Sequence, residues 1–232
     1  MADAPPGFDH PIFSESIRLI RAALAEQPAQ PGFDLASFAP PEQDVLLRLI
    51  HSSGDLSVAA DLRFSPDACS AGLRALALGA PILTDTAMAA AAVAPMARRT
   101  FGNSVHSVLS WAPAQAPLGS TRAAAGMERA LQEHSGSVVL IGSAPTALEL
   151  LLEQVALGQT PAPALVIGMP VGFVGVAESK RHLAASGLAH IRLEGSKGGA
   201  GLVAAACNAL LRAGWCQAAS APSGPTSDSS GS

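Results

Sequence analysis

The sequence predicts an α/β fold of three layers, in which a mainly parallel sheet lies between two layers of helices. Short apolar runs alternate with longer segments of helical periodicity from about residue 56 onward, as in repeated βαβ units. Two of these runs, SVVLIG and ALVIG, are apolar throughout, which is typical of parallel strands covered on both faces. The composition agrees, because 47 of the 232 residues are Ala and only 14% are charged, so the elements can pack closely.

Two helices are expected before this alternation begins. Apolar residues recur at helical spacing over 14–27 and 41–50, and the Pro- and Gly-punctuated segment 28–40 predicts a loop between them. Six strands are then expected, at 56–62, 81–85, 104–109, 137–142, 164–169 and 190–193. Six helices should alternate with them, near 66–78, 87–98, 121–133, 145–157, 177–186 and 199–213.

The chain is expected to form one domain with two loose ends. Residues 1–13 should be an N-terminal arm and residues 14–216 the single domain. Residues 217–232 are rich in Ser, Pro and Gly, which predicts a disordered tail. Ligands of parallel sheets bind beyond the carboxyl ends of the strands, so functional residues should lie in the loops that follow them.

Charge and composition argue against several classes of protein. The net charge is −4 and no basic block is present, so no nucleic-acid partner is expected. The first residues lack the regions of a secretory signal, and the uncharged stretch 154–177 contains three prolines, so no membrane span is expected. The three cysteines lack metal-ligand spacing, which favours packed thiols in a reducing, cytoplasmic location.

The strongest local motif is RLIHSSGD at residues 48–55. Arg48 and His51 are three residues apart and share a helix face, and Gly54 is placed to end that helix. The helix dipole, with Asp55 if it folds back, should raise the pKa of His51, which predicts a protonated general acid. From spacing alone, a helix-capping histidine without chemistry remains the alternative.

Two strand-to-helix turns are candidate anion sites. In IGSAPTA the strand ends at Gly142 and Pro145 suits a first helical position, so backbone N–H groups near Ser143 and Ala144 should face a phosphate or carboxylate. The motif is not a Walker A loop, and an ordinary turn is the alternative. In GSKGG, Lys197 lies between glycines at a helix start and should also bind an anionic group.

Three further features could serve a ligand. In GSTR, Thr121 should cap a helix, and Arg122 in its first turn opposes the helix dipole, so it is expected to face an anion. The glycines of GMPVGFVGVAESK allow a flat ligand to approach with Phe173 against it, although a flexible loop is the alternative. Asp85 ends a strand and is either a site carboxylate or a helix cap. The five other histidines show no metal-ligand spacing, so no metal is expected.

Seven segments, in this order, cover most of residues 10–213: HPIFSESIRLI, RLIHSSGD, DLRFSPDACSAGLRALALGAPILTDTAM, STRAAAGM, IGSAPTALELL, GMPVGFVGVAESK and SKGGAGLVAAACNALL. Together they resemble the precorrin-8X methylmutase family. The resemblance implies a flavodoxin-like sheet, a homodimer and no external cofactor. It also implies an isomerase of cobalamin biosynthesis that moves a methyl group of the tetrapyrrole precorrin-8X from C11 to C12, giving hydrogenobyrinate. His51 would protonate the macrocycle or hydrogen-bond to it.

On this resemblance, the residues expected to contact substrate are Ser16, Arg48, Ser52, Gly54, Asp85, Met88, Thr121, Arg122, Ala144, Pro145, Thr146, Gly172, Phe173, Lys197, Gly198 and Gly199. The chain departs from the usual family pattern at Thr86, Ala92 and Ser196, where the last replaces an Arg. Three alternatives therefore stay open: a cobalt-precorrin-8 methylmutase, a corrinoid carrier without activity, and a nucleotide-binding flavodoxin-like protein. Transient contacts with neighbouring enzymes of corrin synthesis are also expected.

Overall fold

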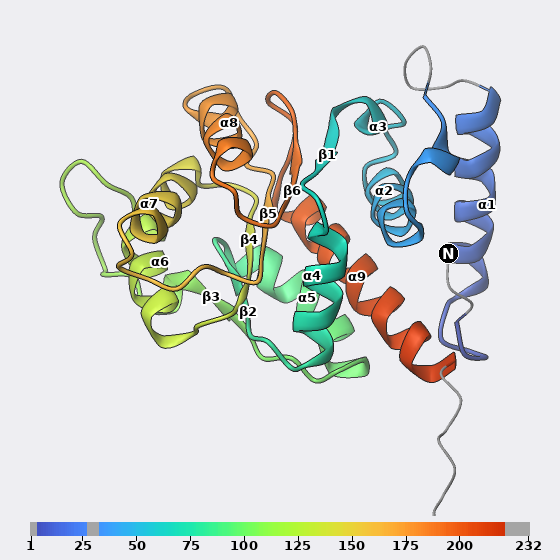
Figure 1. The fold of residues 1–232 in the computed structure, drawn as a ribbon, viewed down its shortest axis with the longest axis horizontal. Helices are drawn as coiled ribbons and strands as arrows, with labels where there is room; N and C mark the ends of the chain where they lie inside the picture. Colours follow the sequence, from blue (N-terminus) through green and yellow to red (C-terminus); the bar gives the residue numbers. More distant parts are fainter. Residues whose placement is uncertain (1–3, 27–32, 221–232) are drawn as a thin grey trace, which may run out of the picture.

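The computed structural model describes residues 4–26 and 33–220, and a six-stranded sheet lies at the centre of this part of the chain (Figure 1). The strands are β1 (Leu62–Phe64), β2 (Ile82–Thr84), β3 (Val105–Ser107), β4 (Val138–Ile141), β5 (Leu165–Gly168) and β6 (His190–Leu193). Their order across the sheet is β1-β6-β5-β4-β2-β3. Strands β2 to β6 are parallel, and β1 pairs antiparallel with β6 at one edge. In chain order the parallel strands run 2-1-3-4-5, one of the common orders of doubly wound sheets.

Helices cover both faces of the sheet, which confirms the three-layer α/β/α fold. The helices are α1 (Pro11–Glu26), α2 (Pro40–Ser53), α3 (Val58–Asp61), α4 (Ala68–Ala77), α5 (Ala87–Arg99), α6 (Arg122–Glu133), α7 (Pro145–Ala156), α8 (Val176–Ala185) and α9 (Ala200–Ser220), with short 3₁₀ turns at Leu35–Ser37 and Val108–Ser110. Helices α6, α7 and α8 lie on one side, while α2, α4, α5 and α9 lie on the other, with α1 packed outside α2 (Figure 1).

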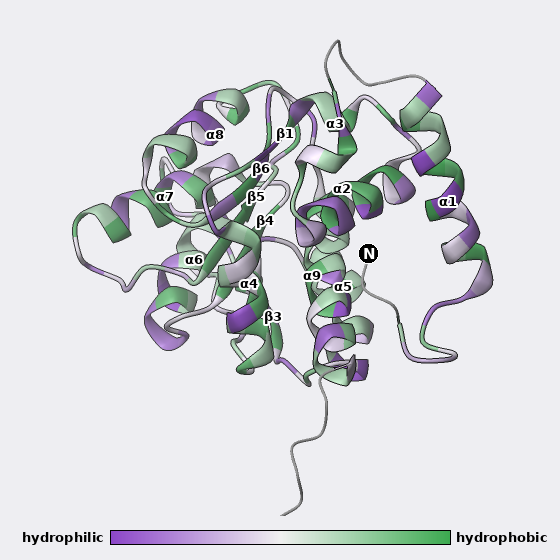
Figure 2. Cartoon of the chain, turned by 45° about the vertical axis from the view of Figure 1, so that its right-hand side comes forward, coloured by the Kyte–Doolittle hydropathy of each residue, from purple (hydrophilic) through white to green (hydrophobic). Residues whose placement is uncertain are grey.

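The strand residues alternate between two hydrophobic cores. In β4, Val138 and Leu140 pack with α4, α5 and α9, whereas Val139 and Ile141 pack with α6, α7 and α8. This is the period of two that a strand imposes on its side chains. Both faces are buried, which explains why the expected strands are apolar throughout and why β4 to β6 are coloured as hydrophobic in the middle of Figure 2.

The structure corrects the strand expected at 56–62. This segment forms a turn followed by α3, and only its last residue, Leu62, belongs to β1. The carboxylate of Asp55 starts the turn by accepting the backbone N–H of Ser57 at 2.8 Å, and the two alanines that follow favour a helix. The five other expected strands are found, with ends shortened by at most two residues.

The boundaries of the domain also differ from those expected. Helix α1 begins at Pro11, inside the expected arm, and α9 continues to Ser220, four residues past the expected end of the domain. Trp215 extends α9 because its ring packs against Phe101, with centroids 5.5 Å apart. Residues 1–3 of the arm, 27–32 between the first two helices and 221–232 of the tail lie outside the described residues. No helix in the described part is both long and apolar enough to span a membrane.

Candidate active site

His51 lies in the last turn of α2 and is held by residues of α1. The hydroxyl of Ser16 lies 2.8 Å from Nδ1 of His51, and the ring of Phe13 meets the imidazole edge-on with centroids 5.2 Å apart. Gly54 ends the helix in the left-handed conformation, at φ 68°, and its N–H donates to the carbonyl of Ile50 at 2.8 Å. The imidazole orientation is therefore fixed from two helices, while part of the ring stays accessible.

The electrostatics of His51 differ from those expected. Burial first, and then the positive charge of Arg48, lower the pKa of His51 from its usual value. The carboxylate of Asp55 does not turn back to the imidazole, because it binds Ser57 and the ammonium of Lys197 instead. The expectation of a protonated His51 near neutrality is thus wrong for the unliganded chain, in which the imidazole is neutral.

Arg48 supports this arrangement from one side. Its guanidinium lies over the ring of Phe13, 4.7 Å from the centroid, and burial lowers its pKa. Arg212, on α9, approaches the same ring at 5.9 Å and binds the carboxylate of Asp9 through both of its ends. Phe13 therefore lies between two arginines and the imidazole.

An apolar hollow opens beside the imidazole. A cavity of about 280 Å³ lies between α1 and the end of α2, and it is lined by Ser16, Leu19, Ile20, Ala23, Ile50, His51, Gly54 and Leu56. A second hollow, of about 440 Å³, shares Ser16 and Leu19 with it and continues along α1 past Ile12, which is 72% exposed. His51 is thus a polar group at the edge of an apolar surface. Ser52, beside it, is exposed.

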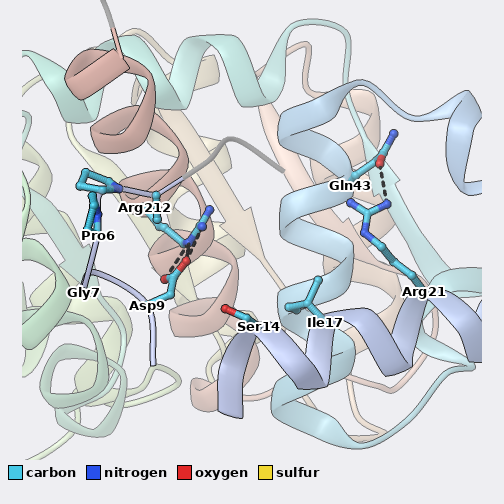
Figure 3. A pocket seen from close by; sticks show the side chains of 10 residues that line it. Pro6, Gly7, Asp9, Ser14, Ile17, Arg21, Gln43 and Arg212 are labelled. Carbon is cyan, nitrogen blue, oxygen red and sulfur yellow. Dashed lines mark hydrogen bonds and ion pairs between the residues drawn. The ribbon is translucent and has the colours of Figure 1, made fainter. Parts of the chain in front are cut away.

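A larger cavity, of about 630 Å³, lies on the other side of α1 (Figure 3). Residues of the N-terminal arm, α1, α2 and α9 line it, and two polar pairs cross it. Arg212 holds Asp9, and Arg21 donates to the amide oxygen of Gln43 at 3.3 Å. These cations already have partners, so this cavity shows no unpaired polar group that would hold a ligand.

The remaining candidate residues lie at the carboxyl ends of the parallel strands. Met88, Thr121, Thr146, Phe173 and Lys197 follow β2, β3, β4, β5 and β6 respectively. Four adjacent strands, β6 to β2, make this edge about 14 Å wide at the usual strand spacing. The sequence therefore predicted which loops share one edge, although the contacts within the edge differ from those expected.

Asp85 fills the expected anion site of the 143–146 turn. Its Oδ2 accepts the backbone N–H groups of Ser143 at 2.6 Å and Ala144 at 2.8 Å. Its side chain is buried at 1% exposure, and burial raises its pKa. The expectations that these N–H groups are free and that Asp85 reaches the substrate are corrected, because the chain supplies its own carboxylate between β2 and β4. The next helix is capped by Thr86, which accepts the N–H of Ala89.

Thr121 joins two of the helix starts at this edge. It caps α6 by accepting the N–H of Ala124, and its hydroxyl lies 2.8 Å from that of Thr146 on α7. Arg122 is exposed, and its Nε donates to the carbonyl of Pro113 at 2.9 Å, which leaves its other guanidinium nitrogens toward solvent. Pro145 begins α7, as expected. Thr146, Arg122 and the 71%-exposed Met88 are accessible from solvent at this end of the edge.

The glycine-rich loops pack against each other rather than leaving an open backbone. A Cβ at Gly198 would lie 1.9 Å from the carbonyl oxygen of Met169, and a Cβ at Gly142 would lie 2.7 Å from Gly199. The N–H of Gly172 donates to Ser196, and that of Gly199 to Met169. The prediction that these glycines admit a flat ligand is corrected for Gly198, since the chain itself occupies the space.

Phe173 is the aromatic residue that this edge offers to a ligand. It lies 94% exposed in the loop between β5 and α8, and its neighbour Val174 is 88% exposed. Gly172 precedes it at φ 134°, a conformation that favours glycine. An apolar ring at the surface of such a loop is available for contact with a flat partner.

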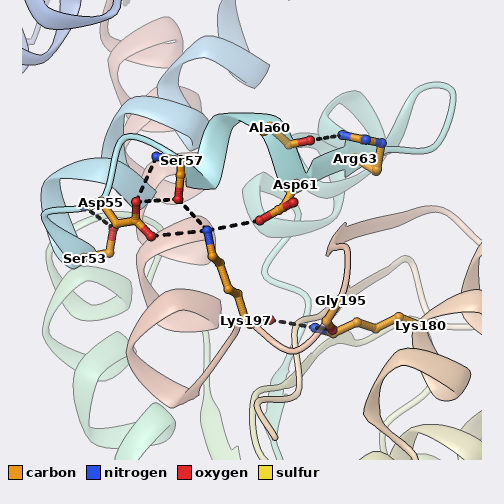
Figure 4. Close-up of polar contacts among 9 residues, drawn as sticks. All are labelled: Ser53, Asp55, Ser57, Ala60, Asp61, Arg63, Lys180, Gly195 and Lys197. Atoms are coloured by element: carbon orange, nitrogen blue, oxygen red, sulfur yellow. Dashed lines mark hydrogen bonds and ion pairs between the residues drawn. The ribbon is translucent and has the colours of Figure 1, made fainter. Parts of the chain in front are cut away.

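Lys197 has a different role from the one expected. Its ammonium lies 3.3 Å from Asp55 and 3.2 Å from Asp61, and it also donates to the hydroxyl of Ser57 (Figure 4). It therefore binds carboxylates of this chain. The contact brings the loop after β6 to the segment that follows His51, which joins the two halves of the candidate site.

Sequence reasoning missed Lys180. This residue of α8 is 1% exposed, and its ammonium donates to the carbonyls of Gly195 at 2.8 Å and Lys197 at 2.6 Å. The local sequence AESKRH reads as a solvated helix face. The only available signal was the apolar spacing of Val176, Lys180 and Leu183, which share the buried face of α8. Among the described residues, no group of three or more His, Cys, Asp or Glu side chains could hold a metal ion.

The comparisons with known proteins agree on one family. The family model for precorrin-8X methylmutase matches residues 11–213 of this chain. A precorrin-8X methylmutase of Pseudomonas aeruginosa is 44% identical over 86% of this chain and 93% of its own length, and one from a Sinorhizobium species is 41% identical over 88% and 94%. The crystal structure of a precorrin-8X methylmutase from Thermus thermophilus superposes with a TM-score of 0.74 at 40% identity, covering 88% of this chain and 98% of that one.

Proposed function

Because this chain belongs to the precorrin-8X methylmutase family, we propose that it isomerises precorrin-8X by moving the methyl group of C11 to C12. The product, hydrogenobyrinate, has the same atoms as the substrate, so the step is an intramolecular transfer within cobalamin biosynthesis. It consumes no external cofactor. The observation that carries the proposal is His51, whose imidazole is oriented by Ser16 and Phe13 at the edge of an apolar hollow.

His51 is proposed as the catalytic residue. Ser16 donates its hydroxyl proton to Nδ1, so the neutral ring carries its own proton on Nε2, and this N–H donates to the macrocycle as charge moves during migration. Arg48 disfavours a second positive charge beside it. A substrate with several carboxylates brings negative charge to the site, which favours protonation of the ring in the complex.

The substrate is proposed to lie across the carboxyl edge of the sheet, which is about 14 Å wide from β6 to β2. Exposed Phe173 and Met88 offer apolar contacts for the ring, and the accessible nitrogens of Arg122 offer an anchor for a side-chain carboxylate. Thr146 and the N-terminal end of α7, with Ala144 and Pro145, complete this end of the site. Asp85, Gly198 and Lys197 support the loops from within.

The departures from the family pattern fall on residues with structural roles in this chain. Thr86 caps α5, the carbonyl of Ala92 accepts the amide of Asn208 at 3.1 Å, and the carbonyl of Ser196 accepts the N–H of Gly172. None of them contacts His51 through a hydrogen bond in the described part of the chain. These departures therefore favour an active enzyme over a carrier that has lost activity.

A cytoplasmic homodimer with a flavodoxin-like sheet is part of the same proposal. The strand order 2-1-3-4-5 supports that description of the sheet. Exposed apolar side chains at Ile12, Leu19, Phe173 and Val174 are consistent with a surface that a second copy covers in part. Light scattering of the purified protein measures the assembly, and a monomer at all concentrations would contradict this part.

The test of the proposed function separates an enzyme from a carrier. Purified protein at one hundredth of the concentration of precorrin-8X should convert all of the substrate, followed by the absorbance change of the macrocycle. A carrier would bind at most one equivalent and leave the remainder unchanged. A parallel reaction with cobalt-precorrin-8 decides the substrate form, since faster conversion of the cobalt compound would reassign the substrate.

A further inference from the structure

Lys180 is a buried cation that the proposed mechanism does not use. Its side chain is among the largest that are fully buried, and lysine is almost never buried without a partner. The partners here are two carbonyl oxygens, those of Gly195 and Lys197, in the loop between β6 and α9. Asp61 and Glu194 add favourable negative charge, and Arg192 opposes it. Burial of this ammonium is therefore devoted to holding one loop.

Lys197 continues the connection from the same loop. Its backbone carbonyl is held by Lys180, while its side chain extends to Asp55, Ser57 and Asp61 (Figure 4). These three residues belong to the segment that begins one residue after Gly54, at the end of the His51 helix. An unbroken series of polar contacts thus runs from α8, through the loop 195–199, to the segment 55–61.

The loop 195–199 is also tied to the rest of the carboxyl edge. The carbonyl of Ser196 accepts the N–H of Gly172, and Gly199 donates to Met169, so the loop after β5 moves with it. Phe173 lies next to Gly172 and is the exposed aromatic of this edge. Displacement of the loop 195–199 would therefore displace a substrate contact as well as release the segment behind His51.

We propose that Lys180 and Lys197 are positioning residues that together clamp the loop 195–199 against the segment 55–61 and so fix the β6 side of the carboxyl edge relative to His51. The effect on turnover rests on the proposed function, because it requires a substrate that touches both parts. The opposing possibility is that Lys197 binds a substrate carboxylate directly, as its place between glycines predicted. The two differ in what the carboxylates of Asp55 and Asp61 do.

A double-variant cycle on Lys197 and Asp61 separates these possibilities. Asp61 is suited to the cycle because Lys197 is the ion-pair partner of its carboxylate. Under the clamp, Lys197→Met and Asp61→Asn should each lower kcat by roughly fivefold, the upper range for a half-exposed ion pair, and the double variant should fall no further. Lys197→Arg, which keeps the charge and the donors, should restore most of the rate. Under direct binding, Lys197→Met would raise KM and Asp61→Asn would leave or lower it, which would overturn the clamp.

Lys180 is tested by the motion of the loop it holds. In hydrogen–deuterium exchange, Lys180→Met should raise the exchange rate of the peptide containing 195–199 by about tenfold, because both carbonyls lose their donor. Arg181→Met is the matched control, since it removes the next cation of α8, which is exposed and bound only to Glu178 in the described part. An unchanged exchange rate in Lys180→Met would overturn the clamp.

The two measurements keep the clamp and the proposed function distinguishable. Exchange is measured on the protein alone and needs no substrate, so it decides the clamp even where turnover fails. If Lys180→Met does not fold, exchange in Lys197→Met decides, with increased exchange in 55–61 expected and unchanged exchange in that segment counting against the proposal. If the wild-type protein converts no precorrin-8X while the loop exchange changes as expected, the proposed function fails and the clamp remains.

Discussion

Substitution of Gly198 by Ala tests whether the edge loops are packed as tightly as the structure shows. The added Cβ would lie 1.9 Å from the carbonyl oxygen of Met169, and also within 2.9 Å of the carbonyl carbon of Pro170. Contacts shorter than 3.0 Å are essentially never observed for a Cβ, so the two loops must separate by about 1 Å or more. That movement also strains the hydrogen bond from Gly199 to Met169.

The expected magnitudes follow from this separation. Overpacking of this kind costs about 1–3 kcal/mol of unfolding free energy, which urea denaturation followed by circular dichroism measures. A displacement of about 1 Å in a positioning element can lower turnover by on the order of 100-fold, which the absorbance assay with precorrin-8X measures. The loss of turnover should therefore exceed the fraction of protein that is unfolded.

Gly201→Ala is the matched control for this substitution. Gly201 lies three residues further along, in the first turn of α9, and nothing lies within 4 Å of an added Cβ. Because Ala favours a helix over Gly, this variant should be as stable as the wild type or more stable by up to about 1 kcal/mol. If Gly198→Ala were as stable and as active as Gly201→Ala, the tight contact between the two loops would be refuted.

Three other predictions concern charges inside the site. First, burial and Arg48 lower the pKa of His51, so kcat/KM should be level above the usual pKa of 6.5 and fall below it; a rise on acidification would show that protonated His51 is the working form. Second, Asp85→Ala should cost about 2–4 kcal/mol in urea denaturation by leaving two buried N–H groups without an acceptor, whereas Asp85→Asn should cost less than half as much, because one oxygen accepts both; equal losses would contradict this. Third, burial lowers the pKa of Lys180 to about 8 from 10.5, so the unfolded chain binds more protons between these values; the wild type should gain stability over Lys180→Met as pH rises through that window, and a parallel pH dependence would contradict the shift.

The sequence predicted best where local pattern and burial agree. The run SVVLIG is covered on both faces, and β4 is found inside it at Val138–Ile141. Gly54 ends the His51 helix as expected, because a left-handed residue is needed there and glycine adopts that conformation readily. Segment 56–62 was misassigned because its apolar residues fit a strand, while the turn that Asp55 begins decides the structure.

The partners of the charged residues could not be predicted from local sequence. Lys197 reaches Ser57, 140 positions away, and Asp85 reaches Ser143, 58 positions away. Each occupies a group that local reasoning left free for a ligand, so the expected anion sites are filled by the chain itself. The same long-range contact withdraws Asp55 from His51, and Arg48 then sets the direction of the shift in its pKa.

The most direct test of the central claim is a comparison of the wild type with His51→Ala on precorrin-8X. The account predicts that the wild type produces hydrogenobyrinate over many turnovers, while the variant still binds the substrate but converts it at least about 100-fold more slowly, since a positioned proton donor contributes that much or more. His182→Ala, which removes an exposed histidine paired with Glu149 on the outer helices, should convert at the wild-type rate. Conversion by His51→Ala at the wild-type rate would contradict the account.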